Sequence, residues 1–165
     1  MGRMQMDEIG GGFQNSRVAI GGNMHIIIVG CGRVGSALAD AGARNGDDVV
    51  VIDKDPQVFR SLGAGFNGTT MRGTGCDQEQ LRQAGIEHCD SFVAATDSDS
   101  VNMMAAEIAL RIYRVPRVVV RLYDPAHERS MQVLGLSYVN DSSLSVQAIL
   151  EALGTIGTDD RRESA

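Results

Sequence analysis

Short apolar runs of strand length alternate along the chain with segments of helical periodicity. The apolar runs fall at 24–29, 48–53, 67–72, 91–95, 117–122 and 136–139. Helix candidates lie between them, at 33–45, 55–63, 77–85, 98–113 and 125–134. Runs such as 49–52 are apolar without alternation, which is typical of strands buried on both faces of a parallel sheet. The pattern predicts a doubly wound α/β fold with a mainly parallel, six-stranded sheet.

The helix candidate at 98–113 has local signals at both ends. Ser98 or Asp99 can cap its start, and Pro116 follows its end. Helical spacing predicts that its core face is made by Val101, Met104, Ala105, Ile108 and Ile112.

The two ends of the chain differ from the alternating region. Residues 1–23 are rich in Gly, Asn, Met and Gln without periodicity, so we expect a flexible extension. The domain itself is predicted at 24–140. A further helix is predicted within 141–154, where two serines precede an apolar pattern, and 155–165 are predicted to be a disordered tail.

Composition narrows the classes of function. The chain has 165 residues, 43% of them hydrophobic, which suits one domain. A net charge of −6 argues against a nucleic-acid binder. The three cysteines are widely spaced and have no histidines at metal-ligand spacing, so we expect a reduced, cytoplasmic setting and no metal site. No run reaches the roughly 20 apolar residues of a membrane span, so we expect no direct membrane insertion.

A glycine loop directly follows the first predicted strand. Its sequence, Gly30-Cys31-Gly32-Arg33-Val34-Gly35, fits the pattern G-x-G-x-x-G and opens a predicted helix. The free N–H groups and the positive end of that helix can then face a pyrophosphate. Gly30 would allow the tight turn, Gly32 the approach of phosphate and Gly35 the packing of helix on strand. This context predicts a Rossmann-type dinucleotide or adenine-nucleotide site.

A carboxylate lies at the position where a Rossmann-type site binds the ribose. Asp53 ends the second predicted strand, 23 positions after Gly30, and can accept hydrogen bonds from ribose hydroxyls. It would also repel a 2′-phosphate, which favours NAD or an unphosphorylated adenosine ribose. The alternative is that Asp53 only starts a turn before Asp55-Pro56. Thr96 and Asp97 end the fourth strand, where they are either ligands or a solvated helix start.

The combined motifs resemble those of one family. Residues 28–35 and 51–56, with Gly73-Thr74-Gly75-Cys76-Asp77, 93–97 and 119–125, resemble the N-terminal nucleotide-binding domain of regulators of potassium conductance, the KTN or TrkA-N domain. The resemblance runs from about 24 to 140. Many members carry Gly-Asp where this chain has Gly73-Thr74, which leaves the preferred nucleotide open.

The resemblance implies a cytoplasmic subunit that forms a homodimer or higher homo-oligomer and lies at the inner face of the cell membrane. Such a subunit binds NAD(H) or ATP/ADP and gates a membrane potassium transporter. It implies phosphate contacts from Gly30, Gly32, Arg33 and Val34, ribose contacts from Asp53 and Lys54, an adenine border at Thr74, Gly75 and Cys76, and a distal lining of Ala95, Thr96 and Arg121. The helix at 142–153 would be the family's crossover helix, which packs on the partner subunit. We expect the family's C-terminal ligand-sensing domain to be absent from this chain.

Two other functions remain open on the sequence. The chain could be a small NAD-dependent oxidoreductase or its cofactor domain, although it offers no catalytic constellation at a usable spacing. Cys31 stands at a helix N-terminus, where a thiolate is stabilised, so a redox sensor is a second alternative. The other interpretation of Cys31 is that this loop position merely tolerates a small residue.

Overall fold

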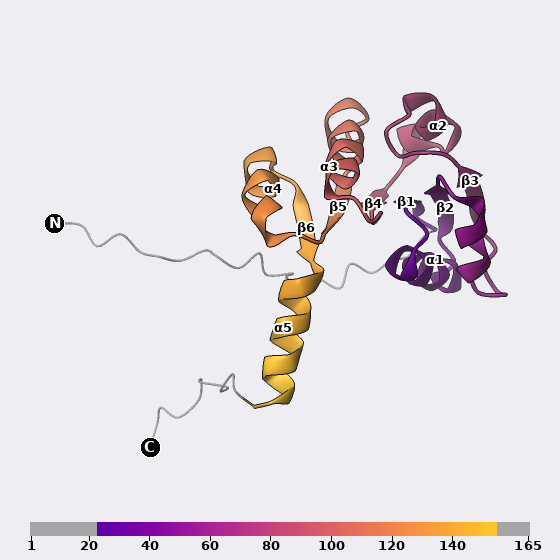
Figure 1. Cartoon of the computed structure of the whole chain (residues 1–165). Helices are drawn as coiled ribbons and strands as arrows, with labels where there is room; N and C mark the ends of the chain where they lie inside the picture. Colours follow the sequence, from indigo (N-terminus) through magenta and orange to yellow (C-terminus); the bar gives the residue numbers. More distant parts are fainter. Residues whose placement is uncertain (1–22, 155–165) are drawn as a thin grey trace, which may run out of the picture.

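A six-stranded sheet forms the centre of the molecule (Figure 1). The computed structural model describes residues 23–154, so the predictions for 1–22 and 155–165 lie outside the described residues. The strands are β1 (His25–Val29), β2 (Asp48–Asp53), β3 (Thr69–Arg72), β4 (Ser91–Ala94), β5 (Arg117–Leu122) and β6 (Ser137–Asn140). Their order is β3-β2-β1-β4-β5-β6, and every neighbouring pair is parallel. The predicted Rossmann-type α/β fold is confirmed, with a sheet that is parallel throughout.

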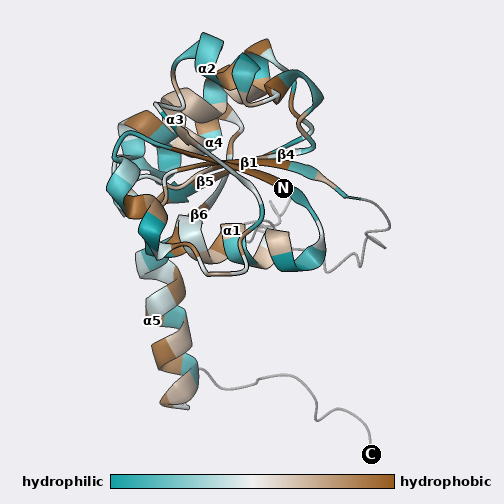
Figure 2. Ribbon diagram, turned by 90° about the vertical axis from the view of Figure 1, so that its right-hand side faces the viewer, coloured by the Kyte–Doolittle hydropathy of each residue, from teal (hydrophilic) through white to brown (hydrophobic). Residues whose placement is uncertain are grey.

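Helices cover both faces of this sheet. They are α1 (Arg33–Asn45), η1 (Pro56–Ser61), α2 (Gln78–Gln83), η2 (Ile86–His88), α3 (Asp99–Glu107), η3 (Ile108–Ile112), η4 (Pro125–His127), α4 (Glu128–Leu134) and α5 (Asp141–Ala152). Figure 2 shows α1 on one face and α2, α3 and α4 on the other. This arrangement is what an all-parallel sheet requires, because each right-handed crossover places a helix on one face or the other.

The apolar side chains of the strands contribute to two hydrophobic cores, one on each face of the sheet. Val49 and Val51 of β2 pack toward α1, whereas Val50 and Ile52 pack toward the opposite face. Successive side chains of a strand point to opposite sides of the sheet, so both sets must be apolar when helices cover both sides. Ile27, Val49, Val51 and Ile52 are completely shielded from solvent.

The face predicted for the helix at 98–113 is right at Ala105, which is buried, and wrong at Met104 and Ile112. Met104 and Ile112 are 58% and 53% exposed, while the buried positions are Asp99, Asn102, Ala105, Ala106 and Ala109. The hydrophobic pattern misplaces the face because two polar side chains are buried with hydrogen-bond partners, and because alanines allow close packing on the sheet. The helix also changes character, since α3 ends at Glu107 and a π-helical segment, η3, continues to Ile112.

Two other predicted segments are shorter than expected. The segment at 55–63 forms η1, a 3-10 helix over Pro56–Ser61 whose start is capped by Asp55, which accepts a hydrogen bond from the Gln57 amide at 2.9 Å. The strand predicted at 67–72 begins only at Thr69. Capping and edge position set these boundaries more than the apolar pattern does.

Helix α5 projects away from the rest of the domain (Figures 1 and 2). It begins directly after β6 and contains no buried residue. Its apolar side chains are instead exposed, among them Leu144, Val146, Ile149 and Leu153 at 55%, 56%, 57% and 69%. The helix predicted in this segment therefore exists, and its apolar surface is uncovered within the described part of one chain.

Candidate functional site

A cavity of about 540 Å³ opens at the carboxyl ends of the strands. Its walls come from the ends of β1, β2, β3, β4 and β5 and from the segments that follow them. The lining residues are Val29, Gly30, Gly32, Arg33, Ile52, Asp53, Lys54, Asp55, Val58, Gly73, Thr74, Gly75, Ala95, Thr96, Asp97, Ser98, Val101, Arg121 and Tyr123. The strand order reverses between β1 and β4, and open α/β sheets bind ligands at such a switch point. The volume lies within the usual range for small-molecule sites.

The three glycines of the first loop have different structural roles. Gly30 has φ +99°, and an added Cβ would lie 2.7 Å from the Ala95 carbonyl oxygen. At Gly35 an added Cβ would lie 1.9 Å from the Gly30 carbonyl oxygen, so only glycine lets α1 pack here. An added Cβ at Gly32, which lines the cavity, would meet no atom within 4 Å apart from those of Gly32 and its chain neighbours. Gly32 thus keeps open space at the N-terminus of α1, where amide groups and the helix dipole favour an anion.

Asp53 reaches across to the glycine loop from the end of β2. Its carboxylate accepts hydrogen bonds from the Cys31 amide at 2.7 Å and from the Asp55 amide at 2.9 Å. These bonds fix the carboxylate at the edge of the cavity beside the N-terminus of α1. A carboxylate has about four acceptor sites, so two amides leave capacity for the paired hydroxyls of a ribose.

The third strand supplies the wall around Thr74. The Thr74 amide donates to the Gln80 side-chain oxygen at 2.7 Å, and the Thr74 hydroxyl accepts from the Cys76 amide at 3.3 Å. The hydroxyl can still donate its proton to a ligand. Gly75 is buried, and an added Cβ there would lie 2.6 Å from Val29, so this wall packs directly on β1.

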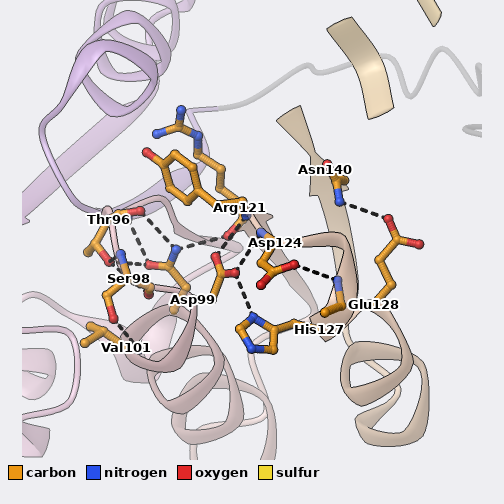
Figure 3. Close-up of polar contacts among 12 residues, drawn as sticks. Thr96, Ser98, Asp99, Val101, Arg121, Asp124, His127, Glu128 and Asn140 are labelled. Atoms are coloured by element: carbon orange, nitrogen blue, oxygen red, sulfur yellow. Dashed lines mark hydrogen bonds and ion pairs between the residues drawn. The ribbon is translucent and has the colours of Figure 1, made fainter. Parts of the chain in front are cut away.

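A buried asparagine joins the ends of β4 and β5. The Asn102 side-chain oxygen accepts from the Thr96 amide at 2.9 Å and from the Thr96 hydroxyl at 2.6 Å. Its amide group donates to the carbonyl oxygens of Thr96 and Arg121 at 3.1 and 3.0 Å. Figure 3 draws these contacts around Thr96 and Arg121. Because Asn102 is fully buried and holds both strand ends, it positions two residues of the cavity wall.

Asp99 holds the segment that follows β5. Its carboxylate accepts from the Tyr123 and Asp124 amides at 2.9 and 3.0 Å, and it contacts His127 Nδ1 at 2.9 Å (Figure 3). Burial pushes the pKa of Asp99 upward, but the hydrogen bonds from His127 and the two amides outweigh burial and hold the pKa below its ordinary value. The same hydrogen bond raises the pKa of His127. Asp99 therefore fixes the backbone of Tyr123, which lines the cavity.

Arg121 brings positive charge to the cavity wall at the end of β5. Its guanidinium lies over the Tyr123 ring, 4.3 Å from the ring centroid, and its Nε donates to Asp141 Oδ2 at 2.8 Å. The hydrogen bond to Asp141 is the largest influence on Arg121 and raises the pKa of its guanidinium. Together with Arg33 and Lys54, Arg121 gives the cavity three cationic side chains suited to phosphate groups.

Most residues predicted for the site meet at this cavity. Those that line it are Gly30, Gly32, Arg33, Asp53, Lys54, Thr74, Gly75, Ala95, Thr96 and Arg121. Cys31, Val34 and Cys76 are not among the lining residues. The Cys31 side chain is fully buried with Ala39 and Val51, and its amide is bound to Asp53. Cys76 packs against the core on the other face.

The buried position of Cys31 weighs against a redox sensor. Burial is the largest influence on its thiol and raises the pKa above the ordinary value of 9.0. A raised pKa disfavours the reactive thiolate, and a completely buried sulfur is closed to solvent oxidants.

Sequence reasoning missed several lining residues. Tyr123 lies two positions after Arg121 and Asp55 two positions after Asp53, and both line the cavity. For Tyr123 the available signal was the period of two along an extended chain, because residues i and i+2 face the same side. Val101 and Ser98 belong to the start of α3, whose orientation only the folded structure reveals.

The described residues 23–154 contain no cluster of three or more His, Cys, Asp or Glu side chains able to hold a metal ion. Within the same residues, no helix is both long enough and apolar enough to cross a bilayer.

Comparison with known proteins agrees with this geometry. The sequence matches the model of the TrkA-N domain over residues 26–141. The chain is 43% identical over 136 residues to the Trk system potassium uptake protein TrkA of Streptomyces coelicolor, and the match covers 82% of this chain and 61% of that relative. The chain thus spans about three-fifths of the length of this relative.

Solved structures share the fold. The TrkA-N domain of the inner membrane protein ybaL from Escherichia coli has a TM-score of 0.71 at 18% identity, covering 81% of this chain and 99% of that one. The Kef C-terminal domain of Shewanella denitrificans in its AMP-bound form has a TM-score of 0.67 at 23% identity, covering 81% and 82%. The family match covers every lining residue of the cavity and all of the sheet except its first residue, and the chain belongs to the TrkA-N domain family.

Proposed function

We propose that this domain binds an adenine-containing nucleotide, NAD(H) or ATP/ADP, in the cavity at the N-terminus of α1. The observation that carries the proposal is the meeting of the open Gly32 position and the Asp53 carboxylate at one cavity. Phosphates would lie against the amides of the glycine loop, and the ribose hydroxyls would bind Asp53. Lys54 would lie by the ribose, with Thr74 and Gly75 at the adenine and with Ala95, Thr96 and Arg121 at the distal end.

The role proposed for this binding is regulatory. The relative from Streptomyces coelicolor carries the name of a potassium uptake protein, and the Kef domain was solved with AMP. By analogy, this chain would be a cytoplasmic, non-enzymatic subunit at the inner face of the membrane that gates a potassium transporter. The nucleotide would bind one arrangement of the assembly more tightly than another and so shift the population that acts on the transporter.

Assembly would use α5. Its apolar side chains Val146, Ile149 and Leu153 recur at helical spacing and are all more than half exposed. An uncovered apolar stripe of this kind gains free energy when a partner covers it. A second copy of this chain would be that partner, so we propose a homodimer or a higher homo-oligomer.

Calorimetric titration of the full chain with NAD, NADH, ATP and ADP tests the proposal. We expect saturable binding of at least one nucleotide, and loss of that binding in Asp53→Ala. Absorbance of the nicotinamide, followed with a panel of small alcohols and aldehydes, should show no turnover. Steady turnover would favour the oxidoreductase alternative, and failure of all four nucleotides to bind would contradict the proposal.

A further inference from the structure

Arg121 belongs to two parts of the molecule at once. It lies near the end of β5 and lines the cavity, and its side chain forms a hydrogen bond with Asp141, the first residue of α5. Both Nε and Nη2 of the guanidinium contact the same oxygen, Oδ2 of Asp141. The pair is largely shielded, since the Arg121 side chain is 14% exposed and that of Asp141 is 34% exposed.

Polar contacts at the start of α5, this pair among them, attach the helix to the rest of the described domain. No residue of α5 is buried. At its start, Asn140 accepts from the Ser143 amide at 3.1 Å and donates to Glu128 at 2.9 Å, so Asn140 ties the cap to α4. Asp141 supplies the tie to the cavity through Arg121. These polar contacts at its start therefore help to set the direction in which α5 leaves the sheet.

The guanidinium also has a defined position with respect to the cavity. The guanidinium lies over the Tyr123 ring, and the Asn102 side-chain amide donates a hydrogen bond to the Arg121 carbonyl oxygen at 3.0 Å. Its Nη1 donates no hydrogen bond to the residues that the structure describes, 23–154. A guanidinium carries five N–H donors, and phosphate competes well for them.

We propose that an anionic ligand group and Asp141 share the guanidinium of Arg121. A phosphate at the distal end of the cavity would then weaken the contact between Arg121 and α5. The inference rests on the proposed function, because it needs a nucleotide in the cavity. The ligand class is a nucleotide with a distal phosphate, since only added negative charge competes for the guanidinium.

Reciprocity makes the proposal measurable. If a distal phosphate loosens the Asp141 contact, then removing the charge of Asp141 must tighten the binding of that phosphate by the same factor. A merely structural role of Asp141, for example through the dipole of α5, would not distinguish nucleotides that differ only in phosphate number.

Binding of ATP and AMP to the full chain provides the test. We expect Asp141→Asn to raise affinity for ATP about fivefold or more and affinity for AMP by less than about twofold. Glu151→Gln is the matched control, because Glu151 lies on the same helix, bonds to Gln147 and does not line the cavity. In an Arg121→Gln background, Asp141→Asn should no longer change the ATP-to-AMP ratio. If Asp141→Asn melts at a lower temperature than the wild-type chain, the same titrations are made with a second variant, Asp141→Ser.

Amide hydrogen exchange gives an independent reading. ATP should speed exchange in the first turn of α5 in the wild-type chain, and Arg121→Gln should abolish this response. An ATP-to-AMP affinity ratio that Asp141→Asn leaves unchanged would overturn this inference while leaving nucleotide binding intact. Absence of any nucleotide binding by the wild-type chain would overturn the proposed function and this inference with it.

Discussion

At the scale of single residues, the glycine loop separates the requirements of folding from those of binding. Gly35 is required by packing, because an added Cβ would collide with the Gly30 carbonyl oxygen at 1.9 Å. Gly32 is extended, at φ −73° and ψ −166°, a conformation that alanine adopts without strain. Its added Cβ would meet open space, and Gly32 lines the cavity.

Two alanine substitutions test this separation. Gly32→Ala should keep the wild-type melting temperature but weaken nucleotide binding roughly tenfold, which is about 1.4 kcal/mol, because a methyl group occupies the space of a phosphate. Gly35→Ala should destabilise the fold by about 3 kcal/mol through overpacking. Thermal melts and titrations measure both effects, and a Gly32→Ala chain that binds as wild type does would contradict the role of Gly32.

At the scale of elements, Asp99 and His127 join α3 to the segment after β5. Asp99 is 8% exposed and bonds to two backbone amides and to the His127 ring. Asp124 lies beside His127 and also favours the charged ring. The network predicts a definite dependence of stability on pH.

The sign of that dependence follows from the two pKa shifts. The hydrogen bond with Asp99 raises the pKa of His127 above 6.5, so its stabilisation is complete below pH 6.5 and is lost as the pH rises through the raised pKa. The pKa of Asp99 lies below 3.8, so its stabilisation is present above pH 3.8 and is lost as the pH falls through the lowered pKa. Denaturant unfolding should show that His127→Gln removes the decline at neutral pH. The control His88→Gln, at an exposed histidine outside this network, should keep it.

Helix α5 exposes apolar side chains that no other described part of the chain covers. The proposed dimer predicts that light scattering detects a dimer at roughly 50 μM, with a monomer favoured on dilution. Ile149→Lys should give a monomer, because it places a charge in the stripe formed by Val146, Ile149 and Leu153. The control Gln147→Lys adds the same charge on the other side of the helix, near Glu151, and should leave the dimer intact. A wild-type chain that is monomeric at this concentration would contradict the proposed assembly.

At the scale of the whole molecule, the sheet and the cavity were largely predictable and the polar links were not. Apolar runs such as 49–52 predict buried strands, and the spacing from Gly30 to Asp53 predicts two residues at one end of the sheet. The contact of Asn102 with Arg121 and the pairing of Arg121 with Asp141 join residues 19 and 20 positions apart. Their geometry depends on how α3, β5 and β6 pack, which local pattern does not encode.

The same reasoning explains the two misassigned positions of the helix at 98–113, Met104 and Ile112. Hydrophobic periodicity assigns burial to apolar side chains, whereas here Asn102 is fully buried and Met104 is exposed. Asn102 satisfies four hydrogen bonds at the ends of β4 and β5, and these offset the cost of burying an amide. A sequence pattern that counts only apolar positions misses a core position of this kind.

A crystal structure of the full chain with a saturating nucleotide tests the central claim most directly. We predict phosphates within hydrogen-bond distance of the loop amides at Gly32 and Arg33, ribose hydroxyls on the Asp53 carboxylate, and the distal end of the ligand near Arg121. A nucleotide bound elsewhere on the molecule, or this cavity empty while Asp53 keeps only its bonds to the Cys31 and Asp55 amides, would contradict it.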